Sequence, residues 1–293
     1  MTAPVLFLAG VPKAGTSSLF AWLAQHPEVT PARCKETRFF ADPGSHVFRP
    51  DFNAGRGHAI DDAFPTPRPG TRLRLEGTPT TIYARTALEH LPGLPGARCL
   101  FVLRDPAEQI RSLHGYFRDN WSYVPADMDF AAYLAAVRAG GHAFGGNELA
   151  ADPLPRADYL PWLEAWRARM GPDRMRVVTF DRLRADPLKL LREVARWCDL
   201  SPEPLDDLST ASENETYAPR SRAIQRINVA LRARLPKGPA YRAARSLYRR
   251  LNTRAPDRSG DAAAMEALRA EFAPANRRLA ESFGLDLAAW MPR

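Results

Sequence analysis

The sequence predicts an α/β fold in which a mainly parallel sheet is flanked by helices. Four apolar runs have the character of buried strands, at residues 4–9, 72–76, 98–103 and 175–180. Each is followed by a helical pattern or a polar crossover, an alternation that is typical of a parallel sheet with helices on both faces. The chain has 293 residues, of which 45% are apolar, so it is long enough to bury such a sheet within one large domain.

The first strand leads into a glycine-containing turn and then a helix. The turn reads GVPKAGTSS over residues 10–18, and a helical apolar pattern covers residues 16–25. Backbone N–H groups at the start of such a helix favour an anion. The two glycines have the spacing of a nucleoside-triphosphate loop, but Thr16 stands where that loop carries lysine, and the lysine lies at position 13. The pattern therefore indicates a phosphate-binding loop that does not bind ATP.

The side chains of this loop also suit a phosphate or sulfate group. Lys13 supplies a compact positive charge, and the hydroxyls of Thr16, Ser17 and Ser18 add hydrogen-bond donors. The alternative interpretation is an ordinary strand-to-helix turn with a capping serine or threonine. The chain holds only four lysines, Lys13, Lys35, Lys189 and Lys237. Because two of them fall in candidate site segments, the lysine usage favours the first interpretation.

Two further segments carry charged residues next to predicted elements. The strand at 98–103 is followed at once by Arg104, and Ser112 comes eight residues later in a helical pattern. Eight residues make about two helical turns, so both residues are expected to face one crevice at the carboxyl ends of the strands. A charged cluster that runs into paired aromatics, RCKETRFF, covers residues 33–40.

Three residues are candidates for a general base. Glu36 is the first, although the residue pattern alone favours a surface carboxylate paired with Lys35 or Arg38. The alternatives are Glu76, at the end of a predicted strand, and His114, two residues beyond Ser112.

The chain resembles the sulfotransferases that use 3′-phosphoadenosine 5′-phosphosulfate (PAPS), most closely the branch of the heparan sulfate enzymes and their bacterial relatives. The matching segments are PKAGTSSL at 12–19, KETRFF at 35–40, EGTPTTIY at 76–83, LRDPAEQIRSLHGYF at 103–117, VVTFDRLRADPLKLL at 177–191 and ANRRLAESFGLDLAAW from 275. They follow the order of the family and extend along the whole chain. The resemblance implies a P-loop-like sulfotransferase fold, with residues 1–293 forming a single sulfotransferase domain.

The resemblance also implies roles for individual residues. Glu36 matches the carboxylate that takes the proton from the acceptor hydroxyl, and Lys13 would stabilise the departing phosphate. The residues implied to bind PAPS are Lys13, Ala14, Gly15, Thr16, Ser17, Ser18, Arg104, Ser112, Arg220, Ser221 and Arg222. One position departs from the family, whose second loop often reads Glu-Lys-[Ser/Thr]-Pro, because Gly77 stands in place of that lysine. A positive charge near the acceptor is therefore missing at this position.

The predicted function is transfer of a sulfonate group from PAPS, as cosubstrate and without a metal, to a hydroxyl of a small-molecule or carbohydrate acceptor. Two alternatives remain open: an ATP-dependent kinase, which would require magnesium, and a non-catalytic protein that binds a nucleotide or a nucleic acid. The segment 216–256 holds eleven basic residues and no acidic one. It lacks a nucleic-acid-binding motif and interleaved aromatics, so no nucleic-acid partner is predicted.

Cysteine usage and hydropathy predict a cytoplasmic chain. Cys34, Cys99 and Cys198 are far apart and odd in number, which indicates neither a disulfide framework nor a zinc site. No segment approaches the roughly 20 apolar residues of a membrane span. The apolar run at 5–11 has no basic residue before it, and we expect it to be a strand rather than a signal peptide.

Overall fold

A five-stranded parallel sheet forms the centre of the fold, as predicted. The computed structural model describes residues 3–205, 218–221, 224–225, 248, 251–254 and 259–292. The strands are β1 (Val5–Gly10), β2 (Val29–Pro31), β3 (Leu73–Glu76), β4 (Arg98–Leu103) and β5 (Met175–Thr179). Their order in the sheet is β2-β3-β1-β4-β5, and every pair is parallel. The predicted α/β class is therefore confirmed.

The described chain divides into two compact units. The first contains the sheet and comprises Met1–Asp105, Asp158–Asn214 and Phe272–Met291. The second comprises Pro106–Ala157, Glu215–Glu271 and Pro292–Arg293. The single domain expected over residues 1–293 stays a prediction.

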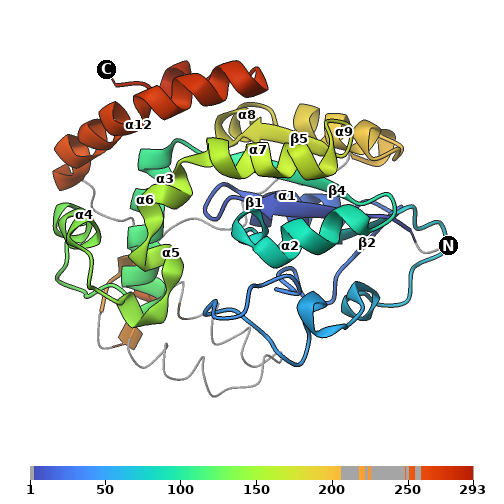
Figure 1. Ribbon diagram of the computed structural model, residues 1–293, viewed down its shortest axis with the longest axis horizontal. Coiled ribbons are helices and arrows are strands. Elements are labelled where there is room, and N and C mark those ends of the chain that lie inside the picture. The colour runs from blue at the N-terminus through green and yellow to red at the C-terminus, as the bar shows by residue number, and fades with distance from the viewer. Residues whose placement is uncertain are drawn as a thin grey trace. The chain divides into compact units, whose positions relative to one another are not determined.

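Helices of the first unit flank the sheet (Figure 1). They are α1 (Thr16–Leu23), α2 (Arg85–His90), α7 (Tyr159–Met170), α8 (Phe180–Ala185) and α9 (Pro187–Trp197). All six residues of β1 are buried, which is what a central parallel strand with both faces covered requires. Two buried indoles link elements of this unit by hydrogen bonds. Trp166 Nε1 on α7 donates to the Ile82 carbonyl at 2.9 Å, and Trp290 Nε1 donates to Asp181 Oδ2 on α8 at 2.7 Å.

The second unit is mainly helical. It contains α3 (Pro106–Tyr116), α4 (Phe130–Ala139), α5 (Glu148–Ala151) and α6 (Pro153–Ala157), with one π-helical turn at Phe117–Trp121. A short antiparallel pair joins β6 (Ala218–Pro219) to β7 (Thr253–Arg254). The last long helix, α12 (Ala262–Phe283), contributes its first part to this unit and its second part to the sheet unit.

The order of the strands decides which loops meet. Strand β1 lies between β3 and β4, and the carboxyl ends of all three parallel strands lie at one edge of the sheet. The segments that follow them are the loop 11–15, Gly77 with Thr78, and Arg104. Open α/β sheets bind their ligands at this edge, and the sheet therefore brings the predicted candidates of the first unit together.

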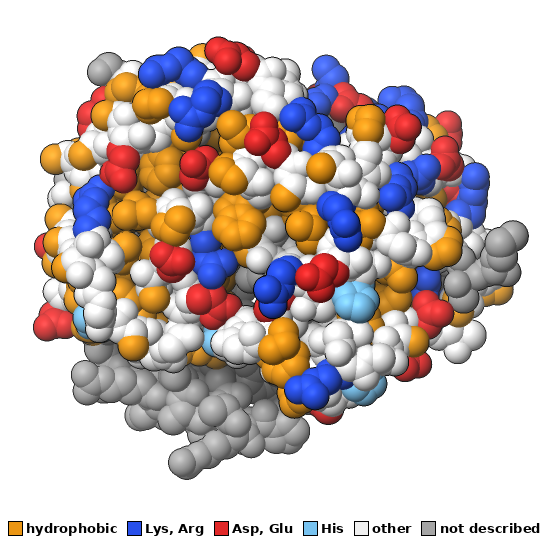
Figure 2. Space-filling view, viewed as in Figure 1, with side chains coloured by type: hydrophobic (Ala, Val, Ile, Leu, Met, Phe, Trp, Pro, Cys, Tyr) orange, Lys and Arg blue, Asp and Glu red, His pale blue; other side chains and the backbone are white. Residues whose placement is uncertain are grey.

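One face of the molecule can be seen to carry charges of both signs. Figure 2 shows Lys and Arg side chains interspersed with Asp and Glu on the face drawn. None of the helices in the described parts of the chain has both the length and the apolar character that crossing a membrane requires.

Candidate functional site

The loop after β1 has a backbone shape that depends on glycine. Lys13 and Gly15 both have left-handed conformations, with φ of 68° and 84°. A Cβ atom at Gly15 would lie 2.8 Å from Leu183 Cδ2 and 2.9 Å from Phe180 Cε2. Both the backbone angle and the space therefore exclude a side chain at this position.

Helix α1 begins directly after this loop, at Thr16. Gly15 is its N-cap residue and provides no side-chain hydrogen bond to the first turn. The first amides of a helix have no acceptor within the helix itself, and their dipoles favour an anion. Thr16 is buried in the first turn, whereas Ser17 and Ser18 are half-buried there. The predicted loop residues thus form the N-terminal end of one helix, with buried Ala14 packed beneath them.

Two cationic side chains converge on this loop. Arg104 Nη1 donates to the Lys13 carbonyl at 2.9 Å, and its guanidinium lies 5.0 Å from the centre of the Phe180 ring. The Tyr159 hydroxyl donates to the Arg104 carbonyl at 2.9 Å and so fixes the backbone from the other side. Arg104 therefore reaches the loop from the adjacent strand β4.

The surroundings of Lys13 disfavour its positive charge. Burial, followed by repulsion from Arg104, lowers the pKa of Lys13 from 10.5 to about 8, while the nearby Glu36 carboxylate opposes this shift. Two cations beside an uncapped helix start repel one another until an anion arrives. The N–H groups of the helix start and the two cations are chemically suited to an anion.

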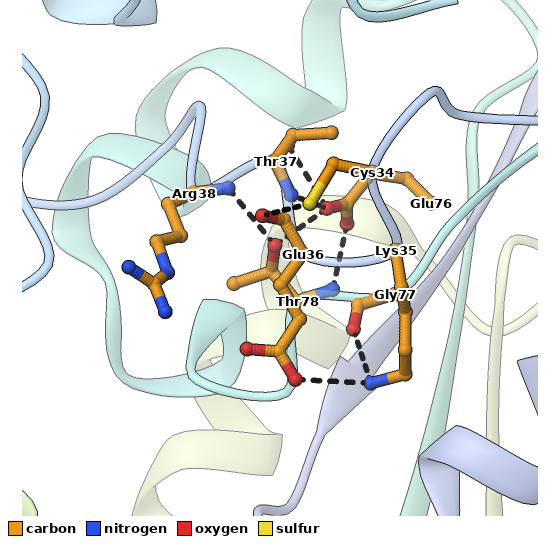
Figure 3. A network of polar contacts seen from close by, with 8 residues as sticks. All are labelled: Cys34, Lys35, Glu36, Thr37, Arg38, Glu76, Gly77 and Thr78. Carbon is orange, nitrogen blue, oxygen red and sulfur yellow. Dashed lines mark hydrogen bonds and ion pairs between the residues drawn. The ribbon is translucent and has the colours of Figure 1, made fainter. Parts of the chain in front are cut away.

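Glu36 lies in the segment between β2 and β3, beside Lys35 (Figure 3). Lys35 Nζ donates to Glu36 Oε1 at 3.1 Å and to the Gly77 carbonyl at 2.9 Å. The Glu36 side chain is 39% exposed. The ion pair that the residue pattern left open as an alternative is thus present, with a carboxylate that solvent or a substrate can still reach.

Glu76 holds the Glu36 segment in place. Its buried carboxylate accepts hydrogen bonds from the amide and the hydroxyl of Thr37, at 3.0 and 2.9 Å, and from the amide and the hydroxyl of Thr78, the amide at 3.0 Å (Figure 3). The Arg38 amide in turn donates to the Thr78 hydroxyl at 3.1 Å. Burial raises the pKa of Glu76, and the hydrogen bonds from Thr78 and Thr37 oppose that rise. All these contacts indicate a structural carboxylate rather than a base.

We expect Glu76→Gln to lower the free energy of unfolding by about 1–3 kcal/mol, because the amide nitrogen of glutamine would face a donor and leave it unsatisfied. Urea denaturation of the variant measures this loss. Glu89→Gln, an exposed change on α2, is the matched control and should change stability by less than about 0.5 kcal/mol. Full stability of Glu76→Gln would mean that the carboxyl is protonated at neutral pH, and would contradict the prediction.

His114, the other alternative base, lies in the second unit on α3. Its side chain is buried, and Nε2 lies 3.0 Å from the Met128 carbonyl, so this nitrogen carries the proton. The rings of Phe130 and Tyr133 lie 5.5 and 5.1 Å from the imidazole. Burial lowers the pKa of His114 to about 4. Its surroundings are those of a core histidine.

The remaining predicted donor contacts also belong to the second unit. Ser112 on α3 is buried, and its hydroxyl has no hydrogen-bond partner among the described residues. Arg220 Nε donates to the Thr253 carbonyl at 3.0 Å, and the Ser221 amide donates to Asn252 Oδ1 at 2.7 Å. Arg222 lies outside the described residues. Lys13, Arg104 and Glu36 are therefore brought together in the first unit, whereas Ser112, Arg220 and Ser221 belong to the other.

Comparison with known proteins identifies the family of this chain. A family model described as "Sulfotransferase family" matches residues 4–204, well over half of the chain. The chain belongs to the sulfotransferase family. The resemblance inferred from the sequence motifs is thereby confirmed.

Relatives of this sulfotransferase-family chain include large bifunctional enzymes. Human bifunctional heparan sulfate N-deacetylase/N-sulfotransferase 3 is 26% identical over 212 residues, which cover 68% of this chain and 22% of that protein. The Drosophila melanogaster bifunctional heparan sulfate N-deacetylase/N-sulfotransferase is 22% identical over 220 residues, with 68% and 20% covered. The chain thus spans about a fifth of the length of the curated relatives it matches.

A solved sulfotransferase structure shares the fold. The crystal structure of a sulfotransferase from Alicyclobacillus acidocaldarius superposes with a TM-score of 0.66 at 21% identity and covers 99% of both chains. This likeness shows that the described part of the chain has the fold of that sulfotransferase.

Some site residues were not found by sequence reasoning. Phe180, which packs on Gly15 and Arg104, follows strand β5 directly, and its position at the carboxyl end of a strand is a usable signal. Thr37 gave no signal because its role depends on a carboxylate distant in the sequence. Thr78 lies two residues beyond that carboxylate, but nothing in the sequence pattern marked it as a partner. Within the described part of this sulfotransferase-family chain, no cluster of three or more His, Cys, Asp or Glu side chains is arranged to hold a metal.

Proposed function

We propose that this protein transfers a sulfonate group from PAPS to a hydroxyl of a small-molecule or carbohydrate acceptor. One observation carries the proposal: Lys13 and Arg104 meet at the uncapped start of α1, close enough to Glu36 for its charge to act on Lys13. An anion donor and a general base would then share one edge of the sheet. Membership of the sulfotransferase family supports sulfonate transfer as the chemistry.

The residues present fit the charged groups of PAPS. The loop from Lys13 to Ser18 would hold the 5′-phosphosulfate, since its amides, hydroxyls and lysine are all donors. For the 3′-phosphate, the family resemblance implies Arg104, Ser112, Arg220, Ser221 and Arg222, the last of which lies outside the described residues. The buried hydroxyl of Ser112, which lacks a partner among the described residues, supports this role because buried donors are rarely left unsatisfied.

In the proposed mechanism Glu36 accepts the proton of the acceptor hydroxyl as the oxygen attacks sulfur. The new oxygen–sulfur bond forms while the bond from sulfur to the bridging phosphate oxygen breaks. Lys13, in its protonated form, stabilises the negative charge that develops on that leaving oxygen. Sulfonate transfer resembles phosphoryl transfer in its loose, in-line geometry, so positioning and charge stabilisation would supply most of the catalysis.

The depressed pKa of Lys13 predicts how binding depends on pH. Below about pH 8 the lysine is charged, and binding of 3′,5′-adenosine diphosphate (PAP) should be strongest. As the pH rises through about 8 the free protein loses this charge, and affinity should fall by up to about tenfold per pH unit. Calorimetry from pH 6.5 to 9.5 at constant ionic strength would show the fall. Lys13→Arg, which stays charged, should remove it, and a flat profile for the unaltered protein would contradict the prediction.

Two measurements test the proposed function. Calorimetry should show binding of PAP without a metal, and a preference for ATP with magnesium would instead favour a kinase. Incubation with [³⁵S]PAPS and a metabolite extract of the source organism should yield a labelled product, which mass spectrometry would identify. An N-sulfated product would support PAPS as the sulfonate donor but would show that the acceptor is an amine rather than a hydroxyl. Absence of both PAP binding and label transfer would overturn the proposal.

A further inference from the structure

Lys35 and Gly77 fit together in a way that the motifs do not reveal. A Cβ atom at Gly77 would lie 3.3 Å from Lys35 Cγ and 3.5 Å from Lys35 Cε. It would also lie 2.9 Å from Phe20 Cδ2. The aliphatic part of Lys35 therefore runs over the bare α-carbon of Gly77, as Figure 3 shows.

The ammonium group at the end of this stem is held at two points. It donates to the Gly77 carbonyl at 2.9 Å and to Glu36 Oε1 at 3.1 Å. The Lys35 side chain is only 21% exposed. Exposed ion pairs gain little because two long side chains must be ordered to form them. Here the packing on Gly77 and the carbonyl contact order the lysine in advance, so its pairing with Glu36 costs less entropy.

The pairing treats the two carboxylate oxygens of Glu36 differently. Lys35 occupies Oε1, whereas Oε2 accepts no hydrogen bond from any of the described residues. A carboxylate that acts as a base needs one oxygen aimed at the proton it will take. The geometry leaves Oε2 for that purpose.

We propose that Lys35 is a positioning residue, which anchors Glu36 through Oε1 and supplies near the acceptor the cation that position 77 has no side chain to provide. The inference rests on the proposed function. During transfer the proton of the acceptor hydroxyl passes to Glu36 Oε2, and Lys35 keeps its own protons throughout. Gly77 is then required, because a side chain there would displace the lysine stem.

Amine labelling tests the packing without any acceptor. The chain has four lysines, so pulse acetylation followed by mass spectrometry reports on each of them, with exposed Lys189 as the internal reference. Gly77→Ala should raise the acetylation rate of Lys35 by about two- to fivefold, the range that loss of a partly exposed ion pair implies. Gly93→Ala is the matched control, because a Cβ there meets nothing within 4 Å. An unchanged Lys35 rate in Gly77→Ala would overturn the inference.

Kinetics test the positioning role. With [³⁵S]PAPS and the metabolite extract as acceptor mixture, Lys35→Ala should lower the initial rate by about 10- to 100-fold, because a misplaced base loses alignment. PAP affinity should stay close to that of the unaltered protein. Lys35→Arg should restore part of the rate, because the guanidinium keeps a positive charge beside Glu36 Oε1.

Two results would count against the inference: an unaltered rate in Lys35→Ala, or a Lys35→Arg variant no faster than Lys35→Ala. A packing role alone predicts that Lys35→Met, which keeps the stem without the charge, would be as active as Lys35→Arg. If the unaltered protein neither binds PAP nor transfers label, the proposed function fails instead, and the labelling experiment still decides whether Lys35 is held on Gly77.

Discussion

Replacing Lys13 by methionine is expected to slow sulfonate transfer by about 10²- to 10³-fold, because the leaving phosphate loses a preorganised cation. PAP should also bind more weakly, since the same charge faces the nucleotide before and after transfer. The free protein should nevertheless be no less stable, because burial and Arg104 already disfavour the charge of Lys13. Initial rates with [³⁵S]PAPS, calorimetry with PAP and urea denaturation measure the three effects.

Lys189→Met is the matched control for this change. Lys189 is exposed on α9, so the same loss of an ammonium there should leave rate, PAP affinity and stability unaltered. A Lys13→Met protein that transfers sulfonate at the original rate would remove Lys13 from the mechanism. A less stable one would contradict the depressed pKa of Lys13, which predicts that its charge costs stability.

Replacing Glu36 by glutamine is expected to lower the rate by about 10²- to 10⁴-fold, because the amide cannot accept the proton of the acceptor. PAP binding at pH 7 should remain. Since Glu36 raises the pKa of Lys13, its loss should also shift the alkaline fall in PAP affinity to lower pH. Initial rates and calorimetry across the pH range would show both effects.

Glu89→Gln is the corresponding control, an exposed glutamate on α2 whose neighbour Arg85 is 3.8 Å away. It should change neither the rate nor the pH profile. An active Glu36→Gln protein with the original rate would return the role of base to Glu76 or His114, in spite of their burial. A pH profile without the shift would show that the charge of Glu36 does not affect the pKa of Lys13.

The sequence predicted those parts of the fold and site that local patterns specify. Apolar runs identified β1, β3, β4 and β5 within a residue or so of each end, because buried parallel strands are continuously apolar. Strand β2 was missed, since three residues ending in Pro31 carry no period. The position of Lys13 was predictable because glycines and a helix start surround it.

Contacts between distant segments were beyond the reach of sequence patterns. Glu76 was considered only as a base, because its four donors come from two segments that the fold brings together. From the sequence, Gly77 was expected to leave the site without a positive charge at this position, whereas in the structure the Lys35 side chain packs over it. The roles of Glu36, Ser112 and Arg220 stay predictions, as does that of Arg222, which lies outside the described residues.

The hydrogen bonds that Glu76 accepts from Thr37 and Thr78 have a consequence for which parts of such a sequence can vary. Thr37 and Arg38 are fastened to the end of β3 by hydrogen bonds that do not involve the long connection 42–69. Parts of that connection also pack on the anchored segment, since Asn53 donates to the Ala41 carbonyl at 2.9 Å and the Phe52 ring lies 4.9 Å from that of Phe39. Only its exposed positions can therefore change sequence without disturbing the backbone next to Glu36. Library mutagenesis for new acceptors is therefore best confined to the exposed positions of 42–69, with Thr37, Thr78 and Glu76 left unchanged.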